Sequence, residues 1–243
     1  MVTSTSRRRL VATVVAAAAG LGVVPAASAE DARAAAPSTD QVVQEWYGDF
    51  LFREDPAADP DRGYWVGRLD RGDRRGDVAW SLTETREYAE VNVAFLYDYY
   101  FDRTPDRGAE GWVSGVAGRG MALEWVEQNL LASEEYWLAA NSSRTELVRV
   151  WYADLLGRDA SRADISYWSA RTDQIGRLAA VREIWYSQEA VDRRIRGNYF
   201  DLLGRLPSPG EVGYWRPLER ESDRNVQVLI AATPEYERVA LSD

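Results

Sequence analysis

One set of landmarks recurs four times along this 243-residue chain and limits the possible folds more than any other feature. Each copy has an aromatic segment ending in Arg, a Trp about ten residues later, and a closing Ser or Thr two residues before Glu. The aromatic segments are residues 46–53, 96–103, 151–158 and 198–205. Their tyrosines, Tyr47, Tyr97, Tyr152 and Tyr199, lie 50, 55 and 47 residues apart. We therefore expect four tandem repeats of about 50 residues each.

The residues around these landmarks predict helices. A closing Ser or Thr suits a helix N-cap, because its hydroxyl accepts a free backbone N–H, and Glu in the next turn favours the positive end of the helix. Apolar residues then recur at helical spacing. Gly157 and Gly204 follow Leu-Leu, where a left-handed residue ends a helix. The closing residues are Thr85, Ser133, Ser187 and Thr233.

A second helix is expected in each repeat. Ser208, Pro209 and Glu211 have the pattern of a capping box with proline in the first turn, and Asp59 plays the same part in the first copy. The Tyr-Trp pair lies on this helix, and a third helix follows in some copies. Alternation typical of strands is rare. The chain is therefore predicted to be all-α, with two to three helices in each repeat.

The N-terminus has the features of an export signal. Three arginines at 7–9 precede an apolar run over 10–24, and small residues around Ala29 complete the pattern. We predict a signal peptide over residues 1–29, cleaved after Ala29, and a flexible segment over 30–37. Secretory and twin-arginine export both fit this pattern. The mature protein is expected to be secreted, extracellular or associated with the cell envelope.

The repeats are predicted to form two pairs. Residues 139–142 interrupt a helical pattern, and Ser143 with Glu146 then begins a new helix with a capping box. Repeats 1 and 2 are assigned to 38–142, and repeats 3 and 4 to 143–243. Whether the pairs pack as one body or two stays open at this point, as does the oligomeric state.

The composition excludes several kinds of site and partner. The chain has no His and no Cys, which removes Ser-His-Asp and Cys-His catalysis, structural zinc sites and disulfides. It also has no Lys, so a P-loop and Schiff-base chemistry are absent. Loss of the three signal-peptide arginines takes the formal charge from −10 to −13, a balance that repels nucleic acid and anionic lipid. We predict no nucleic-acid partner, no cofactor, no metal and no transmembrane segment in the mature chain.

Carboxylates supply the remaining chemistry. A glycoside hydrolase needs two acids beside a sugar cleft, and no pair stands out among the 39 acids. Asp154 and Asp201, beside repeat landmarks, are expected on helix surfaces or paired with arginine. Loop 55–63 has oxygen ligands that suit calcium, but it lacks EF-hand spacing, so an acidic loop of caps and turns is favoured and calcium dependence stays open. No catalytic residue is predicted, and the chain is not expected to be an enzyme.

The aromatic and arginine landmarks also have competing interpretations. One Trp recurs in every copy, and burial between helices is expected for Trp65, Trp112, Trp168 and Trp215. Three further tryptophans have no counterpart in every copy and are better candidates for an exposed contact, although burial is favoured there too: Trp46, Trp137 and Trp151. Four arginines past helix ends are expected to neutralise the helix terminus or to pair with a loop acid, not to bind an anion: Arg53, Arg103, Arg158 and Arg205.

The third and fourth copies resemble a bacterial family. A Tyr-x-x-Leu-Leu-Gly-Arg segment, a loop and a Tyr-Trp ten residues after Arg resemble the domain-of-unknown-function family 4214. Residues 158–168 and 205–215 match at full spacing, whereas Phe52 and Asp102 replace Gly in the first two copies. The resemblance implies a helical domain, found in tandem in secreted and surface-associated proteins and similar to the phycobilisome linker domain. It implies protein–protein or surface association and transfers no catalytic residue.

These observations favour a secreted, non-catalytic helical repeat module that associates with another protein or a cell-envelope component. One alternative is an extracellular glycan- or peptidoglycan-binding protein that uses exposed aromatic rings. A second is a carboxylate-pair glycoside hydrolase. Exposed tryptophans would favour the first, and a cleft with two carboxylates about 5–9.5 Å apart, one with a raised pKa, would favour the second.

Overall fold

The computed structural model describes residues 38–53, 59 and 61–240, and every regular element in this part of the chain is a helix. The predicted all-α fold is confirmed, whereas the predicted signal peptide and the segment 30–37 lie outside the described residues. The helices are α1 (Thr39–Leu51), α2 (Arg62–Asp70), α3 (Arg75–Thr83), α4 (Arg86–Phe101), the short 3-10 helix η3 (Arg107–Ala109), α5 (Glu110–Gly118), α6 (Leu123–Leu131), α7 (Glu134–Ala139), α8 (Arg144–Leu156), α9 (Arg162–Ile175), α10 (Arg177–Trp185), α11 (Gln188–Leu203), α12 (Pro209–Glu221), α13 (Asp223–Ala231) and α14 (Pro234–Ala240).

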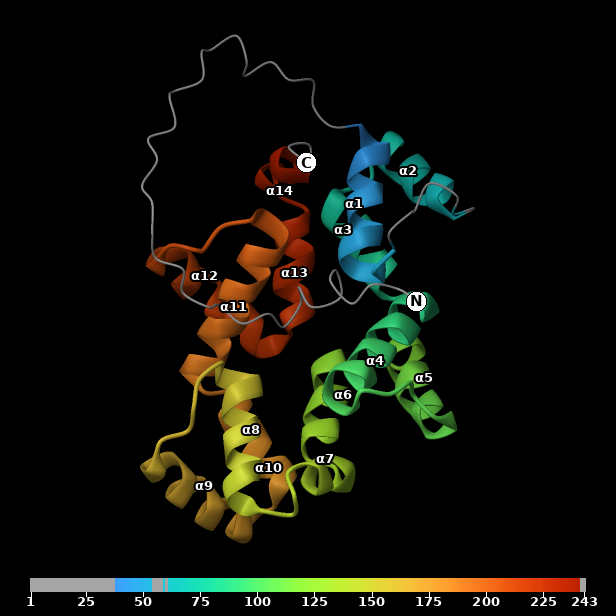
Figure 1. Ribbon diagram of the computed structural model, residues 1–243. Helices are drawn as coiled ribbons and strands as arrows, with labels where there is room; N and C mark the ends of the chain where they lie inside the picture. Colours follow the sequence, from blue (N-terminus) through green and yellow to red (C-terminus); the bar gives the residue numbers. More distant parts are fainter. Residues whose placement is uncertain (1–37, 54–58, 60, 241–243) are drawn as a thin grey trace.

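Three kinds of helix alternate along the chain (Figure 1). We call the helices that carry the landmark tyrosines the long helices; they are α1, α4, α8 and α11. Each packs against the helix that follows it, which we call its outer helix: α2, α5, α9 or α12. A third helix comes next: α3, α6, α10 or α13. These third helices pair between segments distant in sequence, α3 with α13 and α6 with α10. The two halves of the chain are thereby joined at two places.

The first and last described helices lie side by side (Figure 1). The indole Nε1 of Trp46 in α1 donates to the carbonyl of Ala231 at 3.1 Å, at the end of α13. In the same way, Trp151 in α8 donates to the carbonyl of Leu131 at 3.0 Å, at the end of α6. The join between α14 and α1 thus repeats the contacts around the covalent connection from α7 to α8.

A second pair of hydrogen bonds strengthens this parallel. Tyr236 donates its hydroxyl to Asp49 at 2.6 Å, and Tyr136 donates to Asp154 at 2.6 Å. The break between α7 and α8 occurs where the sequence predicts it, and Asn141 there adopts a left-handed backbone. In one half, α7 and α8 are consecutive helices joined by a short connection. In the other half, α14 and α1 make the matching contacts without a covalent connection.

The predicted helix starts are largely confirmed. In all four closing motifs the Ser or Thr side chain accepts the backbone N–H three residues on; these caps are Thr85, Ser133, Ser187 and Thr233. Ser208 forms the predicted capping box with Glu211 at α12. The prediction for α2 was wrong, because the helix begins after Asp61. Asp59 instead accepts the backbone N–H of Asp61 and pairs with Arg53.

The helix ends show why the first two copies tolerate the loss of glycine. Gly157 and Gly204 cap α8 and α11 with left-handed backbones, as predicted. Phe52 and Asp102 hold the same conformation after α1 and α4, with φ of 54° and 51°. A side chain in this region costs roughly 1 kcal/mol relative to glycine. The left-handed cap is therefore retained in all four copies, at a higher local cost in two.

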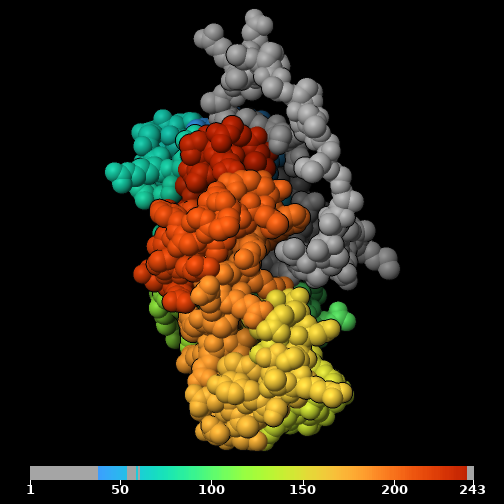
Figure 2. Space-filling view, turned by 90° about the vertical axis from the view of Figure 1, so that its left-hand side faces the viewer, coloured from blue at the N-terminus to red at the C-terminus, as the bar shows by residue number. Residues whose placement is uncertain are grey.

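Two apolar clusters form the core. The larger combines residues of α1 to α6 with residues of α11 to α14, and the smaller lies among α6, α7, α8 and α10. The molecule is elongated in Figure 2, with α2 and α3 toward one end and α8 and α9 at the other. Within residues 38–53 and 61–240, none of the helices combines the length and the hydropathy that crossing a bilayer requires.

The two indole–carbonyl bonds at the ends of α6 and α13 generate a prediction. Trp46→Phe and Trp151→Phe should each lower the free energy of unfolding by about 1–3 kcal/mol, because each leaves a buried carbonyl without its donor. Urea denaturation of the purified protein measures both effects. Trp125→Phe, at a tryptophan that is 38% exposed, is the control and should have little effect. Two unequal losses would contradict the equivalence of the two joins.

Candidate functional site

The recurring order of Tyr and Trp along the chain corresponds to one contact between helices. Trp168 donates Nε1 to the hydroxyl of Tyr152 at 2.7 Å, and Trp215 donates to Tyr199 at 2.7 Å. The same partners meet in the first two copies, since hydrogen bonds from Trp65 and Trp112 lower the pKa of Tyr47 and Tyr97 against the larger, raising effect of burial. Each long helix is thereby tied to its outer helix.

The landmark arginines pack above the same tyrosines. Each guanidinium lies 4.8–5.3 Å from the ring centroid of the Tyr in its own copy. Each also pairs with the Glu of the next closing motif; the pairs are Arg53–Glu87, Arg103–Glu135, Arg158–Glu189 and Arg205–Glu235. Loop acids add to these pairs: Asp59, Asp106, Asp164 and Glu211. The predicted pairing with loop acids is confirmed, and internal carboxylates occupy all four arginines.

The tryptophans follow the predicted burial only in part. Trp65 and Trp215 are buried, whereas Trp112 and Trp168 are half-buried. Among the candidates for an exposed contact, Trp46 and Trp151 are fully buried and Trp137 is half-buried. Those two positions lack a counterpart in every copy because they sit at the two joins, not because they face solvent.

Exposed aromatic rings are found instead at the tyrosine beside the recurring tryptophan. Tyr64, Tyr167 and Tyr214 are 58%, 58% and 68% exposed, on α2, α9 and α12. Neighbouring side chains on a helix point about 100° apart, so burial of the Trp turns the preceding Tyr outward. Helical geometry could have predicted this exposure from the sequence. The second copy has Gly111 at this place.

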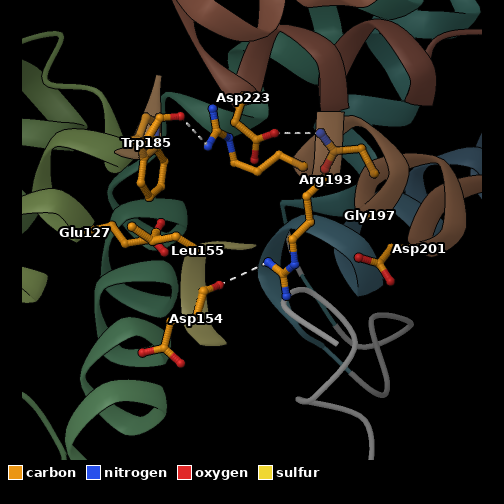
Figure 3. A pocket seen from close by; sticks show the side chains of 10 residues that line it. Glu127, Asp154, Leu155, Trp185, Arg193, Gly197, Asp201 and Asp223 are labelled. Atoms are coloured by element: carbon orange, nitrogen blue, oxygen red, sulfur yellow. Dashed lines mark hydrogen bonds between the residues drawn. The ribbon is translucent and has the colours of Figure 1, made fainter. Parts of the chain in front are cut away.

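A polar cavity, here called the central cavity, lies among α6, α8, α11 and α13 (Figure 3). It has a volume of about 90 Å³, and its carboxylates are Glu127, Asp154, Asp201 and Asp223. Arg193 reaches the backbone carbonyl of Asp154 at 3.1 Å, across the gap between α11 and α8. A second cavity of about 80 Å³ shares Glu127 and Asp223 with the first. These two acids therefore line both cavities.

Asp154 and Asp201 are half-buried residues of α8 and α11. Asp154 accepts the hydroxyl of Tyr136 at 2.6 Å, and burial raises its pKa. Both aspartates line the central cavity.

Glu124 crosses from α6 to cap α13. Its carboxylate accepts the hydroxyl of Ser222 at 2.7 Å and the backbone N–H of Asp223 at 2.5 Å. Ser222 itself makes no side-chain cap bond to α13. A cap supplied by a residue 99 positions away has no local sequence signal. This contact orders the third helices of both halves.

Asp223 is enclosed by polar partners. Asn198 donates to one of its oxygens at 2.6 Å and Gln227 to the other at 2.7 Å. Burial raises the pKa of Asp223. Burial also raises the pKa of Glu219, and the charge of Asp223 raises it further, while Arg194, at 2.6 Å, opposes both. Glu219 and Asp223 therefore bind a proton more readily than a free carboxylate does. The hydrogen bonds to Asp223 described above come from other residues of the chain.

The cavity contains acids with a raised pKa, as a glycosidase requires, but has little room for a sugar. Burial raises the pKa of Glu127 to about 7, partly offset by the hydroxyl of Tyr100 at 2.5 Å. Pockets that enclose organic ligands usually measure about 300–1,000 Å³. A space of about 90 Å³ suits a few water molecules. The geometry therefore does not favour the glycoside hydrolase alternative, and the absence of catalysis stays a prediction.

The acidic loop is only partly described. Of residues 55–63, positions 55–58 and 60 lie outside the described residues, and Asp59 is held by Arg53. In the described part of the chain, no group of three or more acids is arranged to hold a metal ion. Calcium binding at this loop stays untested.

Comparison with known proteins identifies no relative. No family model matches the chain, nor does any curated protein sequence or solved structure.

The raised pKa of Glu127 generates a pH-dependent prediction. The folded state holds its proton up to about pH 7, whereas the ordinary value is 4.5, so the free energy of unfolding should fall as the pH rises between these values. Glu127→Gln keeps an acceptor for Tyr100 and removes the titration. The free energy of unfolding of the variant should exceed that of the wild type by on the order of 2–3 kcal/mol at about pH 8 and equal it near pH 4.5. Denaturation across this pH range measures the difference.

Glu221→Gln is the control for this measurement, because Glu221 is an exposed acid at the end of α12. It should leave the pH dependence unchanged. Parallel stability curves for Glu127→Gln and the wild type would show that Glu127 does not titrate in this range.

Proposed function

We propose that the mature chain is a non-catalytic helical repeat module that works outside the cytoplasm and associates with another protein or a cell-envelope component. One observation carries the proposal. The recurring Arg, Glu and Trp side chains are engaged within the chain, whereas three equivalent outer helices each present an exposed tyrosine. The recurring Arg, Glu and Trp side chains thus make contacts within the chain, and the exposed tyrosines of the outer helices remain available to a partner.

The recurring contacts support four units of about 50 residues. Each unit would comprise a long, an outer and a third helix, and the Arg after its long helix would pair with the Glu of the closing motif that follows its third helix. The matching joins at α7–α8 and α14–α1 support a closed arrangement with approximate two-fold equivalence between the halves. A closed arrangement offers its outer circumference to a partner, unlike an open stack of repeats.

The proposed location rests on the sequence. The charged, apolar and small-residue pattern of residues 1–29 favours export, and the balance of −13 after cleavage disfavours nucleic acid and anionic lipid. The resemblance to the domain-of-unknown-function family 4214 rests on the motifs at 158–168 and 205–215 and points the same way. Secreted and surface-associated proteins are the setting it implies.

Removal of the exposed tyrosines tests the proposal. The variant Tyr64→Ser/Tyr167→Ser/Tyr214→Ser should keep the melting temperature and helical circular dichroism of the wild type, because these rings lie largely outside the core. Retention of the immobilised mature chain's partner from cell-envelope fractions should fall at least tenfold, on the order of the loss of one or two anchor residues.

Tyr186→Ser provides the matched control. Tyr186 is 47% exposed but caps the end of α10 and belongs to none of the outer helices. Its loss should not alter retention. Equal retention by the triple variant and the wild type would refute the assignment of the outer helices, and no retention by the wild type would refute the association itself.

A further inference from the structure

Two of the exposed tyrosines belong to matching polar and aromatic groups. On α2, Tyr64 precedes Arg68 by one helical turn, and Arg68 donates Nε to Asp73 at 2.7 Å. We name these three residues the α2 site. The ring is exposed and the ion pair is partly exposed, since 39% of the Asp73 side chain and 19% of the Arg68 side chain are accessible. Arg68 also donates Nη1 to the hydroxyl of Ser81 at 2.9 Å.

The same arrangement recurs on α9. Tyr167 precedes Arg171 by one turn, and Arg171 binds Glu183 through two hydrogen bonds, at 3.0 and 2.5 Å. We name these residues the α9 site. The side chain of Glu183 is 39% exposed. Its carboxylate comes from α10, whereas Asp73 comes from the connection between α2 and α3, so the same pairing is achieved from different sequence positions.

Each exposed ring rests on a rigid support. Tyr64 meets Trp65 edge-to-face at 4.8 Å, and Tyr167 meets Trp168 at 5.0 Å. Trp168 is in turn bonded to Tyr152, on which Arg158 is stacked. A ring held in this way loses little conformational entropy when a ligand binds its free face. The support favours binding by a preorganised surface.

The surroundings of the rings distinguish a sugar from a protein partner. Within α2 and α9, both described in full, the tyrosine is the single exposed large apolar side chain. Protein contacts concentrate energy in anchors surrounded by other close-packed residues. A pyranose instead offers an apolar C–H face bordered by hydroxyls, which an isolated aromatic ring and an adjacent arginine–carboxylate pair can contact together.

We infer that the α2 site and the α9 site are two equivalent binding sites for a neutral glycan. This inference rests on the proposed association outside the cytoplasm and specifies its ligand class. The α2 and α9 helices lie toward opposite ends of the molecule (Figures 1 and 2). A polymeric or surface-attached glycan can occupy both sites, whereas a short oligosaccharide occupies one. Two shallow, individually weak sites would then act together through effective concentration.

Co-sedimentation of the mature chain with two insoluble probes tests the inference: a β-linked glucan, and wall glycan freed of protein by protease. Tyr64→Ser and Tyr167→Ser should each reduce binding to at least one of these glycans about tenfold, and the double variant about a hundredfold or more, because avidity is lost with either site. Arg68→Gln and Arg171→Gln should also weaken binding while leaving both rings in place. Circular dichroism verifies that every variant is folded.

Tyr214→Ser is the closest control. Tyr214 is 68% exposed and rests on Trp215 in the same way, but Leu218 stands where the two sites have arginine. Its loss should change glycan binding less than about twofold, because the adjacent polar pair is missing. An effect as large as that of Tyr64→Ser would overturn the role given to the arginines.

The remaining outcomes separate the two proposals. Wild-type-like binding by the double variant would overturn the glycan sites. Retention from untreated envelope fractions without binding to either glycan would also overturn them, while leaving a protein partner and the proposed association intact. Absence of retention from both sources would overturn the association as well.

Discussion

The indole of one tryptophan in each outer helix, hydrogen-bonded to a tyrosine of the preceding long helix, is the contact on which the rest of the structure depends. The tyrosine ring also carries the landmark arginine on its free face, and that arginine reaches the start of the next closing helix. One aromatic ring thus orients three helices. Arginine suits this place better than lysine because its planar group stacks and pairs at the same time.

The long helices of the first and third copies differ from those of the second and fourth at the residue before the landmark tyrosine. α1 and α8 each contain a tryptophan directed at a third-helix carbonyl, whereas Leu96 and Asn198 occupy the corresponding places in α4 and α11. The strongest equivalence is therefore between the first and third copies, and between the second and fourth.

Local chemistry made much of the fold predictable from the sequence. Hydroxyl caps, the left-handed Gly157 and Gly204, and the break near Asn141 each depend on a few adjacent residues. The start of α2 was predicted two residues early because an aspartate before proline resembles a cap, although its carboxylate is used by Arg53 instead. The central cavity could not be predicted. Glu127 and Asp223 meet there only because helices from both halves pack together, and neither belongs to a recurring motif.

The contact between α14 and α1 has a mechanical consequence. These helices belong to opposite ends of the described chain, yet they are joined through Asp49 and Tyr236 without a covalent link. Tension applied between the two ends therefore acts first on this contact, and the hydrogen bonds there carry the load before the intervening helices do. For a protein tethered at one end and pulled at the other, this non-covalent join between α1 and α14 would be the point at which it opens.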